Sequence, residues 1–353
     1  MSQRNLRVVL NSRPGVNGEP IEENFRTEEC AYPHEDLLEN HVLVKTLCLS
    51  VDPALRCRMN PNSGVHYMSS WQVGEMADGL AGVGIVMESC SARFEKGDFV
   101  TSTFLWPWMA YFTYPDSKLL TISNALIKSK PSLSLGVLGI TGLTAYVGIT
   151  QKGHVTKGSN QTMVVSAAAG STGSLAGQIG KLEGCAKVVG ICGTNEKCTI
   201  LTEELGFDAA INYKTDDVSK RLQEVCPTGV DVYFDNVGGD VSNAVIKQMT
   251  ESSHVILCGQ ISVYNKDVPY PPPLPQEVET IMKERHITRD RFLVLDYSEK
   301  FESALQILGT YLQEGKLKVK ETISEGIENT GKAFVSMMKG GNIGKQVVHV
   351  ADP

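Results

Sequence analysis

A short run of small residues behind an apolar stretch is the part of this chain best suited to binding phosphate groups. Residues 163–167 (MVVSA) have the composition of a buried strand, and residues 174–183 have that of a helix. Between them lies Ala168-x-Gly170-x-x-Gly173, which matches the dinucleotide fingerprint with alanine in the first glycine position. Small side chains there allow a pyrophosphate to approach the backbone amides at the helix N-terminus. The pattern therefore predicts a dinucleotide site.

The residues after the next predicted strand indicate which dinucleotide binds. A site for NAD usually carries Asp or Glu about twenty residues beyond the fingerprint, where it accepts hydrogen bonds from the ribose. Here the strand of residues 187–191 runs into Cys-Gly-Thr-Asn-Glu-Lys, so neutral residues occupy that position and Lys197 follows. An ammonium attracts the 2′-phosphate of NADP, so we expect NADPH/NADP. Glu196 leaves an alternative open: directed at the ribose it would favour NAD, whereas at a helix start it would act as a capping acid.

Two other predicted strand ends carry polar side chains. Tyr213 follows the third apolar run, where it can lie against the adenosine phosphate or be an ordinary tyrosine at a sheet edge. Asn236 follows the fourth, and open α/β sheets place ligand-contacting loops at that point. We expect its amide to hydrogen-bond the cofactor.

The elements that must position these residues form two regions. Up to about residue 129 the chain has short strand patterns broken by glycine, which is typical of a small β-barrel. Beyond it, strand-sized and helix-sized runs alternate, as in a doubly wound parallel sheet. The expected strands are residues 163–167, 187–192, 209–213, 231–235 and 255–259, and the expected helices are residues 174–183, 196–205, 218–226 and 241–249. The last apolar run, residues 343–350, is expected to return to the first region as a strand. We therefore predict an α/β fold in which residues 1–129 and 318–353 form one discontinuous domain and residues 130–317 form the Rossmann domain.

Composition excludes several functional classes. The formal net charge of −7 over 353 residues lacks the basic surplus of a nucleic-acid-binding domain. No apolar run approaches the roughly 20 residues that a membrane span requires, and the first ten residues do not resemble a secretion signal. Nine cysteines are scattered without a C-x-x-C pair, so we expect neither a disulfide framework nor a structural zinc. A reducing, cytoplasmic setting is the resulting expectation.

Several longer motifs resemble the medium-chain dehydrogenase/reductase superfamily, in its zinc-independent branch of prostaglandin and leukotriene reductases. They cover most of the chain: SVDPALRCRMN (50–60), KGDFV (96–100), VVSAAAGSTGSLAGQIG (164–180), VVGICGTNEKC (188–198), GFDAAINYK (206–214), VDVYFDNVGG (230–239), DVPYPPPLP (267–275), RFLVL (291–295) and GGNIGKQ (340–346).

The resemblance implies a GroES-like β-barrel domain beside the Rossmann domain. It also implies NADPH-dependent reduction of the conjugated carbon–carbon double bond of α,β-unsaturated ketones, with 15-keto prostaglandins as the lipid substrates. No nucleic acid is expected as a partner, and the chain is expected to be a monomer or a homodimer.

Residue roles follow from the same motifs. The resemblance implies contacts with the cofactor from Gly170, Ser171, Thr172, Gly173, Lys197, Tyr213, Asn236, Cys258, Gly259, Gln260, Ile261, Ser262, Val263, Tyr264, Phe292, Leu293, Val294 and Asn342. It implies contacts with the substrate from Phe104, Leu105, Leu293, Val294 and Leu295, and it directs Tyr67 and Tyr264 towards the keto group. Around residues 103–106 the chain carries one residue more than the family pattern, and a leucine where an aromatic residue is expected.

The catalytic chemistry expected here requires no metal. Zinc-dependent members of the superfamily need a histidine with a neighbouring acid, whereas residues 79–82 of this chain read Gly-Leu-Ala-Gly. Conjugate reduction instead needs orientation and a hydrogen-bond donor at the oxygen where negative charge collects. A tyrosine hydroxyl, with an ordinary pKa of about 10, remains protonated at neutral pH and can donate. We expect Tyr264 to be that donor, with Tyr67 as a second candidate. The alternative for Tyr264 is a loop tyrosine that packs on the proline-rich residues 269–275.

Two other functions remain open from the sequence. One is a general quinone or enone reductase of the same architecture. The other is a non-catalytic, NADPH-sensing protein that uses the proline-rich residues 269–275 to bind partners.

Overall fold

Six parallel strands form the sheet that carries the predicted cofactor loops. Their order is β12-β11-β10-β13-β14-β15, in which successive strands extend first to one side of β10 and then to the other. This is the order of a Rossmann sheet, so the predicted fold class is confirmed. The strands are β10 (Thr162–Ser166), β11 (Lys187–Cys192), β12 (Ala209–Asn212), β13 (Val230–Asp235), β14 (Met249–Leu257) and β15 (Thr288–Arg291).

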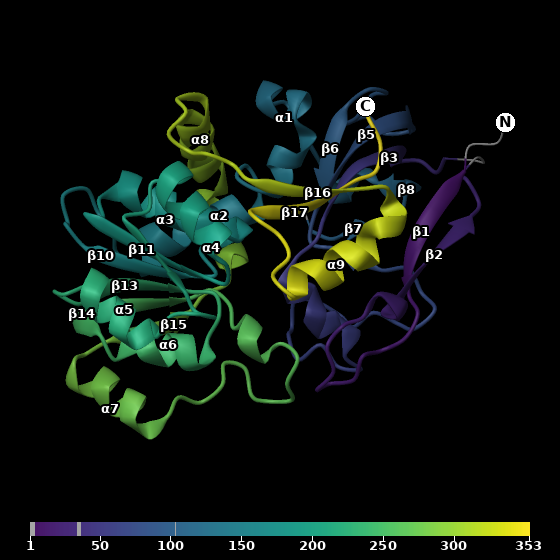
Figure 1. The fold of residues 1–353 in the computed structure, drawn as a ribbon. Helices are drawn as coiled ribbons and strands as arrows, with labels where there is room; N and C mark the ends of the chain where they lie inside the picture. Colours follow the sequence, from purple (N-terminus) through teal and green to yellow (C-terminus); the bar gives the residue numbers. More distant parts are fainter. Residues whose placement is uncertain (1–3, 34–36, 103) are drawn as a thin grey trace. The chain divides into compact units, whose positions relative to one another are not determined.

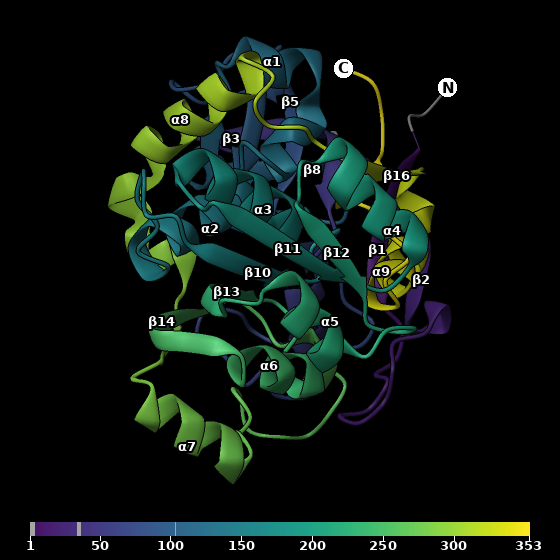
Figure 2. The same ribbon diagram turned by 60° about the vertical axis from the view of Figure 1, so that its left-hand side comes forward.

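Helices cover both faces of this sheet. Figures 1 and 2 show α3 (Ser171–Glu183) on one face and α5 (Val218–Val225) and α6 (Gly239–Ile246) on the opposite face. Because both faces are covered, central strands need apolar side chains on both sides, and all five residues of β10 are buried. Each fully buried aliphatic side chain contributes roughly 1.5–3 kcal/mol. The other helices around this sheet are α2 (Ile140–Val147), α4 (Asn195–Thr199), α7 (Gln276–Glu284) and α8 (Phe301–Gln313).

The N-terminal part of the chain forms a separate β-rich unit. Its main sheet has seven strands in the order β16-β17-β3-β5-β6-β9, and β8 also pairs with β3. The C-terminal strand pairs antiparallel with β3, with Val347 opposite Ser50, which confirms the predicted return of the chain end. The sheet comprises β3 (His41–Ser50), β5 (Gly82–Ser89), β6 (Phe99–Ser102), β8 (Tyr111–Pro115), β9 (Leu119–Thr121), β16 (Glu321–Glu325) and β17 (Lys345–His349).

Smaller elements complete this unit. Its core contains Trp71, Trp106 and Trp108, which are almost fully buried. The smaller strands are β1 (Asn5–Leu10), β2 (Phe25–Cys30), β4 (Asp78–Gly79) and β7 (Trp106–Pro107), and the helices are α1 (Ala125–Ser129) and α9 (Thr330–Met338).

This computed structural model describes residues 4–33, 37–102 and 104–353. It separates into unit 1 (Met1–Leu135, Glu321–Asn342 and Gln346–Pro353) and unit 2 (Gly136–Lys320 and Ile343–Lys345). These limits differ slightly from the domain boundaries expected from the sequence. Residues 130–135 and 318–320 fall on the other side of the boundary from the one predicted, as do residues 343–345.

Sequence patterns located most elements of unit 2 but not their full extent. The segment 255–259 was expected to be a strand, and β14 is longer, beginning at Met249. The helix expected over residues 196–205 is a short α4 continued by a π-helical turn, Ile200–Glu204. The sixth strand, β15 (TRDR), has no apolar pattern, because it lies at the edge of the sheet and most of its side chains are exposed.

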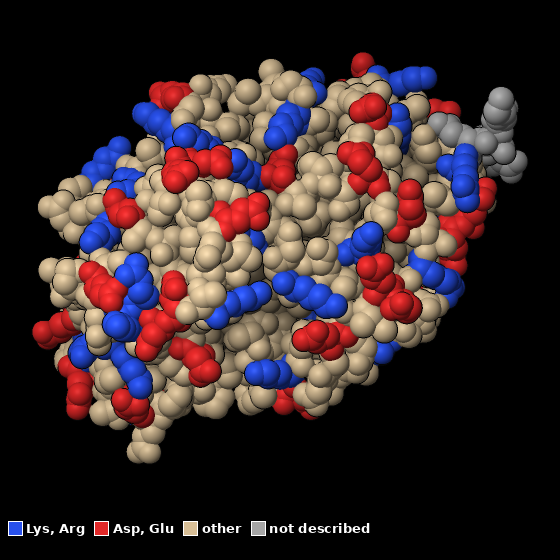
Figure 3. Space-filling view, in the orientation of Figure 1, with Lys and Arg blue, Asp and Glu red and all other residues tan. Residues whose placement is uncertain are grey.

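The surface and the helices give two further observations. Basic and acidic side chains are interspersed over the face shown in Figure 3. Among the described residues, no helix is both long and apolar enough to cross a membrane.

We predict that Gly177→Ala destabilises the protein, although alanine favours helices by roughly 1 kcal/mol over glycine. A Cβ atom on Gly177 in α3 would lie 1.9 Å from Cζ of Phe207, whereas one on Gly309 in α8 would meet no atom within 4 Å. Overpacking costs typically 1–3 kcal/mol, which exceeds the helix gain. Thermal unfolding followed by circular dichroism should give a lower midpoint for Gly177→Ala and an equal or higher one for the control Gly309→Ala. Equal midpoints for the two variants would contradict the packing argument.

Candidate functional site

The turn between β10 and α3 has the geometry of a phosphate-binding loop. The backbone reverses at Ala167, which adopts a positive φ of 48°, and the N–H of Gly170 donates to the carbonyl of Ala167 at 2.9 Å. A Cβ on Gly173 would lie 2.4 Å from that same carbonyl oxygen, so only glycine fits there. Helix α3 begins at Ser171, and the first N–H groups of a helix have no intrahelical acceptor. The loop therefore presents amide donors and the positive end of a helix dipole to an anion.

A second group of residues gathers where β11 and β12 end. Thr194 caps α4, its Oγ1 accepting from the backbone N–H of Lys197 at 3.2 Å. Burial lowers the pKa of the half-buried Lys197, and the nearby cation of Lys214 lowers it further. The ring of Tyr213, 48% exposed, lies over Gly193, where an added Cβ would be 3.0 Å from Cε1. Two ammonium groups held near each other favour a dianionic ligand such as a ribose 2′-phosphate.

Hydrogen bonds attach the start of α4 to the end of β12. The side-chain nitrogen of Asn212 donates to Oδ1 of Asn195 at 2.8 Å. Glu196 is exposed in the first turn of α4, the position where an acid stabilises the helix dipole. The position of Glu196 fits the capping alternative.

Asp235, at the end of β13, is fully buried and organises the loops around it. Its Oδ1 accepts from the Tyr233 hydroxyl at 2.9 Å and from the backbone N–H groups of Val237 at 3.0 Å and Gly238 at 2.9 Å. Its Oδ2 accepts from Oγ of Ser242 at 2.8 Å and from Nε2 of Gln260 at 2.9 Å. A buried carboxylate is tolerated only when its oxygens are satisfied in this way.

Asn236 is partly committed to the protein itself. Its Nδ2 donates to the carbonyl of Ser166 at 2.7 Å, which joins the ends of β13 and β10. This hydrogen bond occupies one of the two Nδ2 protons. The contact with the cofactor that we expect for Asn236 would therefore use its second Nδ2 proton or its Oδ1 atom.

The loop after β14 connects Asp235 to Tyr264. The side-chain Nε2 of Gln260 donates a hydrogen bond to Asp235. The backbone N–H of Gln260 donates to the hydroxyl oxygen of Tyr264 at 3.3 Å. Burial raises the pKa of Tyr264 well above its usual value, so the hydroxyl keeps its proton at neutral pH. The ring of Tyr270, which lies in the proline-rich segment, is 6.1 Å from that of Tyr264. The guanidinium of Arg291 lies 4.7 Å from the Tyr270 ring centroid.

The remaining predicted residues of unit 2 flank these loops. Burial raises the pKa of Cys258 to about 12, so this residue is present as the protonated thiol at neutral pH. Phe292 directs its ring into an apolar cluster with Leu143 and Val147, which leaves its backbone for contact with a ligand. Leu293 and Leu295 are half-buried, and Val294 is buried.

Parallel pairing brings the predicted cofactor residues of unit 2 together. All six strands run the same way, so the residues that follow β10, β11, β12, β13, β14 and β15 lie along one edge of the sheet. These include residues 170–173, Lys197, Tyr213, Asn236, 258–264 and 292–294.

The other predicted site residues belong to unit 1. Tyr67 is half-buried with its ring 5.5 Å from that of His66, in an edge-to-face arrangement. Phe104 and Leu105 are half-buried in the segment between β6 and β7, and Leu105 has an unusual positive φ of 67°. That backbone strain coincides with the extra residue noted in the sequence, while residue 103 lies outside the described residues. Asn342 also belongs to unit 1. Tyr264 belongs to unit 2, so the two tyrosines expected at the keto group come from different units.

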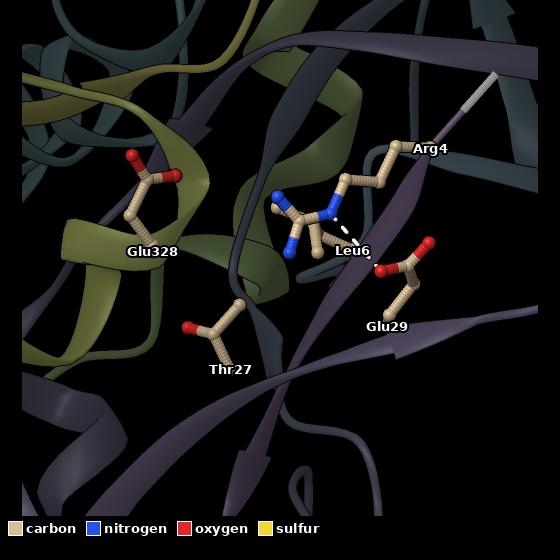
Figure 4. A pocket seen from close by; sticks show the side chains of 5 residues that line it. All are labelled: Arg4, Leu6, Thr27, Glu29 and Glu328. Carbon is tan, nitrogen blue, oxygen red and sulfur yellow. Dashed lines mark hydrogen bonds and ion pairs between the residues drawn. The ribbon is translucent and has the colours of Figure 1, made fainter. Parts of the chain in front are cut away.

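Clusters of metal-ligating side chains and hollows in the surface are the other features that could form a site. Within residues 4–33, 37–102 and 104–353, no group of three or more His, Cys, Asp or Glu side chains is arranged to hold a metal ion. A hollow of about 380 Å³ is lined by Arg4, Leu6, Thr27, Glu29 and Glu328 (Figure 4). It contains none of the predicted site residues, and its charged side chains include the exposed Arg4–Glu29 ion pair at 3.1 Å.

Sequence reasoning missed two contributors to the site. Lys214 directly follows Tyr213, and its charge acts on Lys197, but nothing in the sequence pattern marks it apart from its place at a strand end. Asp235 looked like the last residue of an apolar strand, and only its six neighbouring donors identify it as the centre of a network.

Comparison with known proteins agrees with this geometry. Family models match residues 7–122, described as the N-terminal domain of oxidoreductase, and residues 171–309, described as zinc-binding dehydrogenase. The putative NADP-dependent oxidoreductase YfmJ of Bacillus subtilis is 41% identical over 356 residues, covering 100% of both chains. The NADPH-dependent curcumin reductase of Escherichia coli is 38% identical over 353 residues, covering 99% of this chain and 98% of that one.

Two further relatives extend the comparison. Prostaglandin reductase 1 of Bos taurus is 38% identical over 335 residues, covering 94% of this chain and 95% of that one. The crystal structure of CurA from Vibrio vulnificus in complex with NADPH superposes with a TM-score of 0.88 at 34% identity, covering 99% of this chain and all of that one. With the Rossmann strand order and the phosphate-binding loop, these matches show that the chain belongs to the zinc-independent NADPH-dependent oxidoreductases of the medium-chain dehydrogenase/reductase superfamily.

Proposed function

We propose that this protein uses NADPH to reduce the conjugated carbon–carbon double bond of α,β-unsaturated ketones, with 15-keto prostaglandins as the physiological class. The observation that carries the proposal is the position of the Tyr264 hydroxyl, on the loop after β14, at the same edge of the sheet as the phosphate-binding loop. Relatives named for the reduction of curcumin, prostaglandins and 2-alkenals support the type of substrate. The motifs listed from the sequence favour 15-oxoprostaglandin 13-reductase activity, as in prostaglandin reductase 2.

The residues present fit NADPH. The close approach at Gly173 admits a pyrophosphate to the α3 amides, and Lys197 with Lys214 supplies positive charge for a 2′-phosphate. In this proposal Gly170, Ser171, Thr172 and the loop of residues 258–264 hold the cofactor.

The chain's own residues would then act on the substrate oxygen. NADPH, when bound, would supply the hydride for the β-carbon, and a proton from solvent would complete the reduction at the α-carbon. Negative charge develops on the ketone oxygen, where the Tyr264 hydroxyl would donate a hydrogen bond and stabilise the enolate. Asp235 orients Gln260, and Gln260 holds the loop that carries Tyr264, so the donor is positioned before the reaction.

The apolar residues set the expected substrate class. Phe104, Leu105, Leu293, Val294 and Leu295 would contact a long hydrocarbon chain, and Tyr67 would be a second donor to the keto group.

All nine cysteines lie in the described part of the chain and are free thiols. This is compatible with action in a reducing compartment such as the cytoplasm.

Substrate turnover tests the proposal directly. Mixing the protein with NADPH and 15-keto-prostaglandin E2 should cause loss of absorbance of the reduced nicotinamide, with the 13,14-dihydro product identified by mass spectrometry. A parallel panel of quinones and simple enones should react more slowly. NADPH binding without turnover of any substrate would instead favour the non-catalytic alternative.

Lys197→Ala should weaken NADPH binding selectively. A hydrogen bond to a charged group contributes roughly 1.5–3 kcal/mol, which corresponds to about a 10- to 100-fold rise in the Kd for NADPH. Binding of NADH, which lacks the 2′-phosphate, should change little, and Lys214→Ala should show the same selectivity with a smaller effect. The exposed Lys220 of α5 provides the control variant Lys220→Ala. Equal losses for NADH and NADPH would remove Lys197 from the phosphate site.

Tyr264→Phe should lower kcat far more than it weakens NADPH binding, because phenylalanine keeps the backbone and the ring that we propose contact the cofactor and removes only the hydroxyl. Removing one hydrogen-bond donor from a developing oxyanion typically costs about 3 kcal/mol, or roughly 100-fold in rate. Tyr146→Phe is the matched control, because Tyr146 is also a half-buried tyrosine of unit 2 whose pKa is raised by burial. Steady-state kinetics in which Tyr264→Phe and Tyr146→Phe are equally active would refute the assignment.

A further inference from the structure

Two cysteines beside the proposed 2′-phosphate site have their sulfur atoms in contact. Cys192 is the last residue of β11 and Cys198 lies in α4, and their Sγ atoms are 3.4 Å apart. A disulfide bond of about 2.05 Å requires the sulfurs to come closer by a modest movement only. The two residues are close because the strand-to-helix turn folds back on itself at Gly193 and Thr194.

The environments of the two thiols differ. Cys192 is 3% exposed, whereas Cys198 is half-buried and reachable from solvent. Burial raises the pKa of both thiols, but the contact with Cys192 acts to lower the pKa of Cys198. Cys198 is therefore the thiol that a small oxidant reaches first, and Cys192 is placed to react with the product.

We propose that Cys192 and Cys198 form a reversible disulfide site whose oxidant is a hydroperoxide. The thiolate of Cys198 attacks the peroxide, the O–O bond breaks, and Cys198 becomes a sulfenic acid while the alcohol or water leaves. The thiol of Cys192 then displaces hydroxide from that sulfur; with the thiol proton it leaves as water, and the S–S bond forms. Two electrons pass from the thiols to the peroxide, and a dithiol reductant reverses the reaction by exchange.

The disulfide would act on cofactor binding, a consequence that rests on the proposed function. Lys197 lies next to Cys198, and the N–H groups of both residues bond to Thr194, at 3.2 Å to its Oγ1 and 3.1 Å to its carbonyl respectively. Drawing Cys198 towards β11 displaces this first helical turn and with it the Lys197 side chain. We expect oxidised protein to bind NADPH about tenfold more weakly, on the scale of one charge-assisted hydrogen bond.

Because NADPH binding and oxidation of the cysteine pair are thermodynamically linked, each process changes the equilibrium of the other by the same factor. A tenfold weaker affinity in the disulfide form means that saturating NADPH shifts the thiol–disulfide equilibrium tenfold towards the thiols, or about 30 mV in potential. Bound cofactor would thus protect the pair from oxidation.

Peptide mapping tests the disulfide without reference to activity. Trypsin cleaves after Lys187, Lys197 and Lys214, so the two cysteines fall in separate peptides, residues 188–197 and 198–214. After treatment of the full chain with hydrogen peroxide and blocking of free thiols, these peptides should appear as one linked species that dithiothreitol separates. The species should persist in the control Cys90→Ser, which removes an exposed cysteine of unit 1, and disappear in Cys192→Ser and Cys198→Ser. Loss of thiols without this linked species would overturn the proposal.

Two further measurements separate the parts of the proposal. In Cys192→Ser, dimedone should label Cys198; failure to label it would refute the proposed order of attack. Fluorescence titration of the reduced and oxidised chain should give the tenfold difference in Kd for NADPH. Equal affinities would overturn the coupling while leaving the disulfide site intact, and a reduced chain that binds no NADPH would count against the proposed function instead.

Discussion

The candidate site depends on a buried carboxylate. Asp235 is inaccessible to solvent, and an ionised group in that position is stable only because donors from several elements surround it. Ser166 of β10, Tyr233 of β13, Ser242 of α6 and Gln260 after β14 all reach it, along with the backbone N–H groups at 237 and 238. The carboxylate thereby holds three neighbouring loops in one arrangement.

The loops at one edge of the parallel sheet, next to Asp235, carry different kinds of chemical group. The loop after β10 offers backbone amides and a helix dipole, the ends of β11 and β12 offer two ammonium groups, and the loop after β14 offers a hydroxyl. These groups come from distant parts of the sequence, and parallel pairing alone brings them to one side. Tyr264 is suited to the role that we propose for it because burial disfavours the phenolate and keeps the hydroxyl protonated.

Local patterns were sufficient for most of the fold. The alternation of apolar runs predicted β11 with its observed bounds, and the fingerprint predicted the turn into α3, because strand burial and helix starts depend on short-range composition. The same patterns failed for β15, whose polar edge position carries no apolar signal, and for the division of the helix after Thr194 into an α-helical and a π-helical part. The domain boundaries expected from the sequence differ by a few residues, since linkers are defined by packing.

For the site, the sequence alone determined the position of the dinucleotide fingerprint, the absence of an acid after the second strand and the presence of a lysine there. These follow from residue type and spacing. Only the tertiary structure revealed Lys214 beside Lys197, the donors around Asp235, the contact of the Tyr264 hydroxyl with Gln260 and the approach of Cys192 to Cys198. Each of these depends on how far a side chain is buried and on which neighbour it meets. Such properties arise when strands and helices pack, and no short stretch of sequence contains them.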